Sequence, residues 1–195
     1  GESICLRGPS GIGKTERFSK FKNLVYLKLS NNMFPEIVNG SVNLETGETI
    51  PPEYLKQTYL MLATKEEKQE ILKDVRNLYK YKDAIMERSK TEQAKQEPII
   101  LLLDELLNVK PTTQSLVYNL VLNKRVEVAR GLYLPENVVV VATGNQKKYS
   151  SVASDLAEPL EKRFDHILDM EPKVGEWLEE YAIPNKLHPL VVSYI

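Results

Sequence analysis

Near its start the chain combines glycines, a lysine and a hydroxyl group at fixed spacing. The residues are Gly8, Pro9, Ser10, Gly11, Ile12, Gly13, Lys14 and Thr15. The pattern G-x-x-x-x-G-K-T, between a short apolar run and a helix-like segment, is typical of a phosphate-binding loop, or P-loop. Gly8 and Gly13 allow a tight turn that presents backbone N–H groups to phosphate oxygens, and the dipole of a following helix adds positive potential. Lys14 would neutralise the β- and γ-phosphates and the Thr15 hydroxyl would bind Mg²⁺. The alternative is a glycine-rich turn that happens to precede a lysine.

A pair of carboxylates forms a second candidate site. Asp104 and Glu105 follow five successive aliphatic residues, Ile99 to Leu103, which are typical of a strand covered by helices on both faces. Ligands bind at the carboxyl edge of such sheets, so the pattern is that of a Walker B motif. Asp104 would hold the Mg²⁺ shell through a water, and Glu105 would orient and polarise the water that attacks a γ-phosphate. The alternative is an acidic cap on a buried strand.

Two more polar residues have positions that suit phosphate chemistry. Asn145 ends the apolar strand that starts at Val138, where its amide could hydrogen-bond the attacking water or the γ-phosphate; a simple turn is the alternative. Arg163 precedes a last strand, expected over residues 165–170. A guanidinium can stabilise charge on a transferring phosphoryl group, although most arginines are merely solvated.

Composition limits the class of protein. With 195 residues, of which 42% are hydrophobic, the chain is expected to form one domain, residues 1–195, around one core. A net charge of -1 gives no bias toward nucleic acid or an anionic membrane. Cys5 is the single cysteine and no apolar run approaches about 18 residues, so a reducing cytoplasm fits best and no membrane span is expected. His166 and His188 lack metal-ligand spacing, so no metal beyond nucleotide-bound Mg²⁺ is expected.

The remaining segments predict elements that alternate between strand and helix, as in an α/β fold. A helix over 16–22 and a strand from residue 24 would complete a βαβ opening. Residues 41–50 predict either a small hairpin or an irregular loop. Residues 54–97 predict a long helix or helix pair, inserted into the core, whose mixed charges form a solvated face. Further expectations are a helix over 111–122, a hairpin over 126–134, a helix around Trp177 and another from Pro189.

Together these motifs occur in the order and approximate spacing of AAA+ ATPases, and they resemble the MoxR-like branch most. The resemblance rests on the P-loop, Asp104-Glu105-Leu106, Leu134-Pro135, Gly144-Asn145, the run from Pro159 to Phe164, and Trp177 with His188-Pro189. It covers nearly the whole chain except residues 64–97. It implies a three-layer α-β-α core with five parallel strands in the order 5-1-4-3-2, and a hexameric ring. It also implies that Arg163 is an arginine finger acting on the neighbour's nucleotide, and that the two hairpins are the family's helix-2 insert and pre-sensor hairpin.

The chain departs from that family in two places. Leu107-Asn108 stands where the family commonly has Asn-Arg, and the chain stops at Ile195, before the family's helical lid. We therefore expect only the nucleotide-binding core here.

Three functions are consistent with this sequence. The leading hypothesis is a remodelling ATPase that uses ATP and Mg²⁺, working with a von Willebrand A-type partner as its relatives do. The second is a nucleotide-gated assembly module that hydrolyses ATP too slowly to drive work. The third is a small P-loop kinase, although no motif for a phosphate acceptor is evident.

Overall fold

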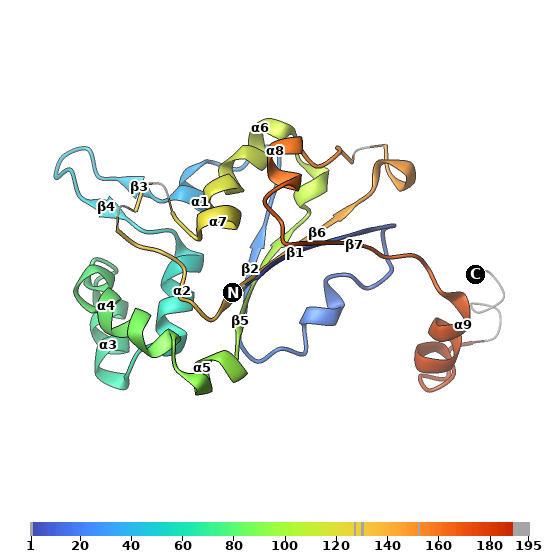
Figure 1. Cartoon of the computed structure of the whole chain (residues 1–195), viewed down its shortest axis with the longest axis horizontal. Coiled ribbons are helices and arrows are strands. Elements are labelled where there is room, and N and C mark those ends of the chain that lie inside the picture. Colours follow the sequence, from blue (N-terminus) through green and yellow to red (C-terminus); the bar gives the residue numbers. More distant parts are fainter. Residues whose placement is uncertain (1, 127, 130, 152, 189–195) are drawn as a thin grey trace.

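A five-stranded parallel sheet organises the chain. The computed structural model describes residues 2–126, 128–129, 131–151 and 153–188 (Figure 1). The strands are β1 (Ser3–Gly8), β2 (Leu24–Lys28), β5 (Ile99–Asp104), β6 (Val138–Asn145) and β7 (His166–Asp169). Their order across the sheet is β2-β5-β6-β1-β7, with every neighbouring pair parallel. Counted in chain order this is 2-3-4-1-5, the expected 5-1-4-3-2 read from the other edge. The predicted α/β fold, with five parallel strands in this order, is confirmed.

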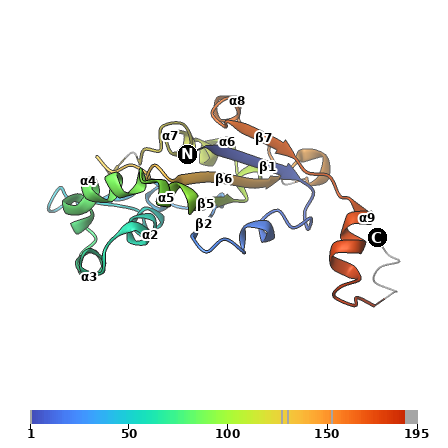
Figure 2. The ribbon, with the colours of Figure 1, turned by 60° about the horizontal axis from the view of Figure 1, so that its bottom comes forward.

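The two faces of the sheet are covered unequally. Alternate side chains such as Val25, Leu101 and Val140 enter the larger core, which also contains residues of most helices. The opposite side chains form a small cluster of Ile100, Leu102 and Val141, with Phe18 packed against it. Figure 2 shows α6 (Pro111–Gln114), α7 (Tyr118–Asn123) and α8 (Glu158–Glu161) on one side of the sheet and the short helical turn of residues 16–18 on the other.

That turn differs from the expected P-loop helix. Residues 16–22 form only a 3₁₀ turn over Glu16–Phe18, followed by an irregular segment that leads into β2. Phe18 and Phe21 still stack, with ring centroids 6.0 Å apart. Few residues separate Thr15 from β2, and the chain must return across the sheet within them. A full helix does not fit, and its dipole is correspondingly absent.

The region between β2 and β5 contains the hairpin and the helical insertion. β3 (Ser41–Val42) and β4 (Thr49–Ile50) pair antiparallel after α1 (Glu36–Asn39), so the hairpin, and not the loop, is present. The expected long helix or helix pair is instead four helices: α2 (Glu53–Leu62), α3 (Lys65–Lys73), α4 (Asn77–Ser89) and α5 (Glu92–Gln96). Hydroxyl caps begin two of them: Thr64, before α3, accepts a hydrogen bond from the Glu67 N–H, and Thr91, before α5, accepts one from the Ala94 N–H.

The later elements follow the expectations in part. The helix over 111–122 is present as α6, a 3₁₀ turn over Ser115–Val117, and α7. The hairpin over 126–134 is not formed as predicted: Arg125 and Tyr133 share one isolated bridge, and Glu127 and Arg130 lie outside the described residues. The helix around Trp177 is α9 (Val174–Trp177), continued by a π-helical turn over Leu178–Ala182. The helix expected from Pro189 lies outside the described residues.

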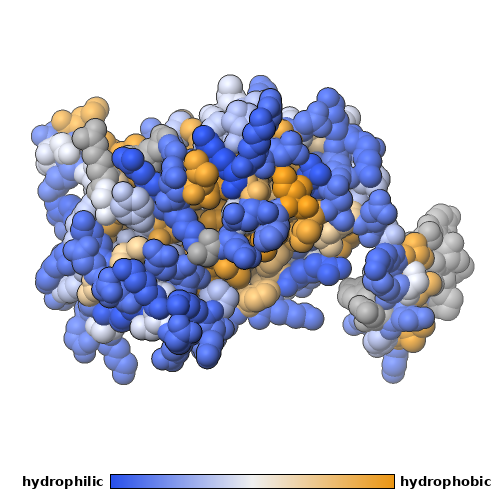
Figure 3. All heavy atoms as spheres, in the orientation of Figure 1, coloured by the Kyte–Doolittle hydropathy of each residue, from blue (hydrophilic) through white to orange (hydrophobic). Residues whose placement is uncertain are grey.

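The surface is largely hydrophilic over the helical insertion, and apolar atoms gather at the tip of the β3–β4 hairpin and over the centre of the molecule (Figure 3). Leu44, in the loop of that hairpin, is almost fully exposed. Within the described part of the chain, every helix is too short or too polar to cross a membrane.

Candidate functional site

The P-loop and the ends of β5 and β6 surround one cavity of about 320 Å³ at the carboxyl edge of the sheet. Its lining residues are Ser10, Gly11, Gly13, Lys14, Thr15, Glu16, Asp104, Glu105, Thr143, Gly144 and Asn145. This size lies within the range of small-molecule sites, and the carboxyl edge is where open α/β sheets bind ligands. Both sequence motifs therefore contribute to a single site.

The loop backbone depends on glycine in two ways. Gly11 and Gly13 have φ of 80° and 78°, a left-handed conformation that side chains rarely adopt. Gly8 instead lies against the residue that follows β7, where an added Cβ would come within 2.5 Å of the Met170 carbonyl oxygen. Pro9 and Ile12 complete the loop between these glycines, with Ile12 beside Gly8.

Lys14 is buried beneath the loop, and three acceptors surround its ammonium group. Its Nζ lies 3.1 Å from the Gly8 carbonyl oxygen, 2.6 Å from that of Pro9 and 3.0 Å from Asn145 Oδ1. Burial lowers the pKa of Lys14, while the charges of Glu105 and Asp104 oppose this shift. An ammonium group has three donors, so contact with a phosphate oxygen requires at least one of these bonds to be exchanged.

Three hydroxyl groups converge on the carboxylate of Asp104. Thr15 Oγ1 donates to Asp104 Oδ1 over 2.9 Å, and Thr143 donates to the same oxygen. Tyr26, on the edge strand β2, donates to Asp104 Oδ2. Burial alone would raise the pKa of Asp104, but the bonds from Thr143, Tyr26 and Thr15 lower it, so the carboxylate stays ionised. Burial and the bond to Asp104 raise the pKa of Tyr26 to about 12, so its phenol remains a donor.

Glu105 is held in an unusual conformation beside this carboxylate. Its φ of 66° is left-handed, and its Oε2 accepts a hydrogen bond from the side chain of Asn108. The Asn108 Oδ1 atom is buried without a hydrogen-bond partner. Leu107 packs under Gly144, where an added Cβ would come within 2.6 Å of the Leu107 side chain. Leu107 and Asn108, the residues that depart from the AAA+ pattern, therefore fix the turn that carries Glu105.

Arg163 does not belong to this cavity. Its carbonyl oxygen accepts a hydrogen bond from the Ser3 hydroxyl, which places it at the amino end of β1. At about 3.3 Å per residue, the six residues of β1 put this point roughly 17 Å from the P-loop. The guanidinium carbon stacks 4.7 Å from the centroid of the Tyr118 ring. Arg163 therefore lies too far from the cavity of its own chain to contact a ligand bound there.

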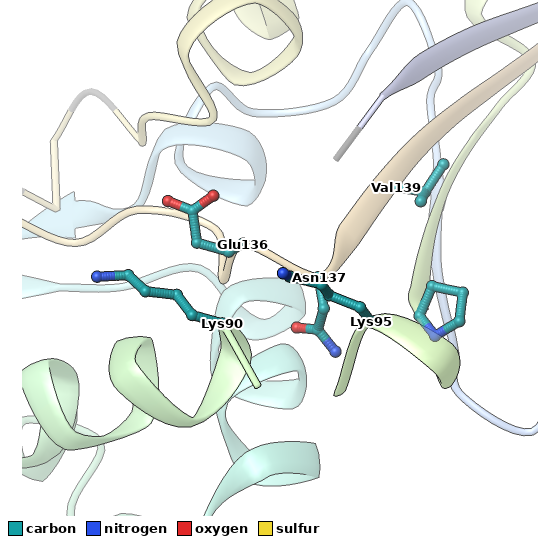
Figure 4. Close-up of a pocket in the computed structure, with 6 residues that line it drawn as sticks. Lys90, Lys95, Glu136, Asn137 and Val139 are labelled. Carbon is teal, nitrogen blue, oxygen red and sulfur yellow. The ribbon is translucent and has the colours of Figure 1, made fainter. Parts of the chain in front are cut away.

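A second cavity of about 480 Å³ lies near the amino ends of β5 and β6, where α4 and α5 meet the sheet (Figure 4). Lys90 and Lys95 line it, but each is paired with a glutamate on the same helix or helix end, at 2.6 Å and 2.8 Å. Asn137 is buried there, and its side-chain N–H₂ donates to the Ala94 carbonyl oxygen. Among the described residues that line it, this cavity has neither the glycine turns nor the carboxylate pair of the carboxyl edge.

The oxygen donors at the carboxyl edge fit a magnesium ion. Mg²⁺ prefers hard oxygen ligands and, at phosphate sites, takes one or two protein oxygens together with the phosphates. While the Thr15 hydroxyl donates its proton to Asp104, its lone pairs remain available to a cation. Hydroxyl groups already bind both Asp104 oxygens, so Asp104 would reach the ion through water. Thr15 and Asp104 are therefore suited to the metal roles expected of them.

Sequence reasoning missed three contributors to this site. Tyr26 and Thr143 lie in segments that the sequence predicts only as strands, and Asn108 differs from the family pattern without a role assigned to it. For Tyr26 and Thr143, the alternation of side chains between the two faces of a strand was a signal available in the sequence. Tyr26 and Thr143 flank the strand that carries Asp104 and project from the same face as Asp104.

Comparison with known proteins supports the fold. No family model and no curated protein matches the sequence. Among solved structures, the chain is similar to the crystal structure of a "putative ATPase" from Cytophaga hutchinsonii ATCC 33406, with a TM-score of 0.54 and 15% sequence identity. The alignment covers 95% of this chain and 46% of that one, so the chain spans less than half the length of this neighbour. At this identity the likeness concerns the fold alone.

Proposed function

We propose that the chain is the nucleotide-binding core of a Mg²⁺-dependent ATPase of the AAA+ class, from its MoxR-like branch. One observation carries the proposal: the Lys14 ammonium group, the Thr15–Asp104 pair and the Glu105 carboxylate all line one cavity. Each group matches a need of phosphoryl transfer, namely charge neutralisation, metal binding and orientation of water.

The residues would divide the chemistry as follows. Backbone N–H groups of the P-loop and the Lys14 ammonium bind the phosphates, and Lys14 exchanges a carbonyl contact for a phosphate oxygen. Thr15, and Asp104 through water, would hold Mg²⁺, which would supply Lewis-acid stabilisation of charge on the phosphate oxygens. Glu105 accepts a proton from the attacking water with Oε1, since Asn108 occupies Oε2. Asn145, already bonded to Lys14, senses the γ-phosphate.

Ring assembly is the part of the proposal that the family resemblance suggests, and the distance of Arg163 from its own cavity agrees with it. Because this residue lies at the wrong end of the sheet for its own site, it would serve the site of a neighbouring chain in a ring, which in AAA+ proteins is a hexamer. Hydrolysis would then remodel or assemble a protein partner, for which a von Willebrand A-type protein is the candidate that the family resemblance suggests.

A nucleotide-gated assembly module with little hydrolysis is the second candidate. The bond between Asn108 and Glu105 favours it, because it restrains the carboxylate that must orient water. A small P-loop kinase remains the third hypothesis.

Steady-state phosphate release from ATP, measured against protein concentration with and without Mg²⁺, separates the three. Turnover per chain that rises as the protein self-associates supports the ATPase. Tight ATP binding with flat, negligible turnover supports the assembly module. Transfer of the γ-phosphate to a small acceptor supports the kinase. A parent protein that binds no ATP in the presence of Mg²⁺ contradicts all three.

A further inference from the structure

Tyr26 differs from the other groups around Asp104 in its origin. Thr15 belongs to the P-loop and Thr143 to the central strand β6, whereas Tyr26 belongs to β2, at the edge of the sheet. In the register between β2 and β5, Lys28 is opposite Asp104 and Tyr26 is opposite Leu102. The phenol of Tyr26 therefore reaches Asp104 diagonally, along a face that it shares with that carboxylate.

The hydrogen bonds divide the two oxygens of Asp104 between two tasks. Oδ1 accepts from the Thr15 and Thr143 hydroxyl groups, so it is the oxygen nearest to the predicted metal ligand Thr15. Oδ2 accepts from Tyr26. A carboxylate bonded on one oxygen alone can rotate about its last bond, whereas bonds on both oxygens fix its plane.

Because Tyr26 is partly exposed, its side chain contributes little to the packing of the core. Tyr26 is 47% exposed, and the small core on this face consists of other residues. The role of the phenol oxygen can therefore be tested without disturbing the packing. Removal of that one atom takes away a hydrogen bond and leaves the ring in place.

We propose that Tyr26 is a positioning residue for the metal, holding Asp104 in the orientation that receives the Mg²⁺ shell of a bound nucleotide. The inference rests on the proposed function, since it assumes a Mg²⁺–nucleotide complex at this site. Partners that orient metal ligands from outside the coordination shell typically contribute 10- to 100-fold to metal affinity.

The test measures ADP binding by calorimetry in EDTA and over a series of Mg²⁺ concentrations. For Tyr26→Phe we expect the apparent Mg²⁺ affinity in the presence of ADP to fall about 10-fold, with ADP affinity in EDTA unchanged. Tyr133→Phe is the matched control, because Tyr133 is 44% exposed and lies outside the cavity lining; neither value should change. Melting temperatures of both variants check that the fold is kept.

A double-mutant cycle shows whether Tyr26 acts through Asp104. In an Asp104→Asn background, Tyr26→Phe should cause no further loss of Mg²⁺ dependence, because the carboxylate it positions is gone. Equal Mg²⁺ dependence in the parent and Tyr26→Phe would overturn the inference, as would equal losses with and without Mg²⁺, or additive losses in the cycle. These results leave the proposed function standing. A parent protein that binds no ADP at all overturns the proposed function and the inference with it.

Discussion

The two ends of the parallel sheet carry similar kinds of residues and use them differently. At the carboxyl edge, Lys14 is buried and bonded to two carbonyl groups of its own loop and to Asn145, 131 positions away in the chain. At the amino edge, Lys95 is exposed and is bonded to Glu92 on its own helix. The first lysine is constrained by the fold, and the second makes the ordinary surface pair that contributes little.

The carboxylates repeat this contrast. Asp104 accepts hydrogen bonds from three segments of the chain, whereas Asp165, at the amino edge, accepts from the backbone N–H and the hydroxyl of Ser3 alone among the bonds described. Parallel strands bring loops from many segments together at their carboxyl ends, so polar groups converge there. Placement in the sheet, more than residue type, separates groups with a chemical role from those that stabilise the fold.

We expect the largest effect from Arg163→Ala. Arg163 lies at the amino edge, where the comparison predicts structural roles, yet we assign it to catalysis in a neighbouring chain. Turnover should fall by roughly 10³- to 10⁵-fold, as for arginine fingers, with ATP affinity nearly unchanged. Phosphate release and ATP titrations measure the two quantities. Mixing Arg163→Ala with Glu105→Gln should restore part of the activity, because a mixed ring can pair an intact Glu105 site with an intact Arg163. Lack of rescue in mixtures that demonstrably co-assemble counts against this role.

Glu105→Gln tests the carboxyl edge directly. The amide is nearly isosteric but cannot accept the proton of water, so turnover should fall roughly 10²- to 10⁴-fold while ATP still binds. Single-turnover phosphate release separates chemistry from binding. Unchanged turnover would remove Glu105 from its role, and loss of ATP binding would indicate a structural one.

Lys14→Ala and Lys95→Ala form a matched pair that compares a lysine at the carboxyl edge with one at the amino edge. Loss of a charged hydrogen-bond donor to phosphate costs about 1.5–3 kcal/mol, so ATP affinity should fall roughly 10- to 150-fold in Lys14→Ala. Lys95→Ala should bind ATP like the parent, although it lines the larger cavity. Equal affinities in the two variants would show that the P-loop is assigned wrongly.

Asp165→Ala should have the smallest effect, confined to stability. The N–H and hydroxyl of Ser3 lower the pKa of Asp165 below its ordinary 3.8, so the folded state gains stability from this group above that pH. The gain disappears as the pH falls through the lowered pKa. The melting temperature of Asp165→Ala should therefore lie about 2–4 °C below that of the parent at pH 7, with a smaller difference at pH 3. A change in the ATP affinity of this variant would contradict the assignment of the amino edge to fold stability alone.

The sequence predicted the sheet and most of the cavity because these depend on local signals. The run from Ile99 to Asp104 predicts a buried strand that ends in a carboxylate. Of the two glycines expected to form the tight turn, Gly13 is left-handed, whereas Gly11 takes the place expected of Gly8. Strand order entered through the family resemblance, since periodicity alone does not determine which strands are neighbours.

The missed features depend on contacts between distant segments or on length. Tyr26 joins Asp104 across 78 positions in the chain, a pairing visible only when the register of β2 against β5 is known. The 3₁₀ turn at Glu16–Phe18 replaces a helix because the loop is too short, although the spacing of Phe18 and Phe21 is helical. The break between α2 and α3 depends on the cap at Thr64, which the sequence carries as a Thr-x-x-Glu pattern.

The left-handed backbone of Glu105 has a consequence for how this chain can evolve or be engineered. A non-glycine residue in this conformation costs on the order of 1 kcal/mol, whereas glycine adopts it without steric cost. A screen for thermal stability should therefore enrich Glu105→Gly, in variants that melt higher and hydrolyse less. Selection on stability alone would remove Glu105, so the residue is expected to persist only where selection acts on the chemistry that we propose for it.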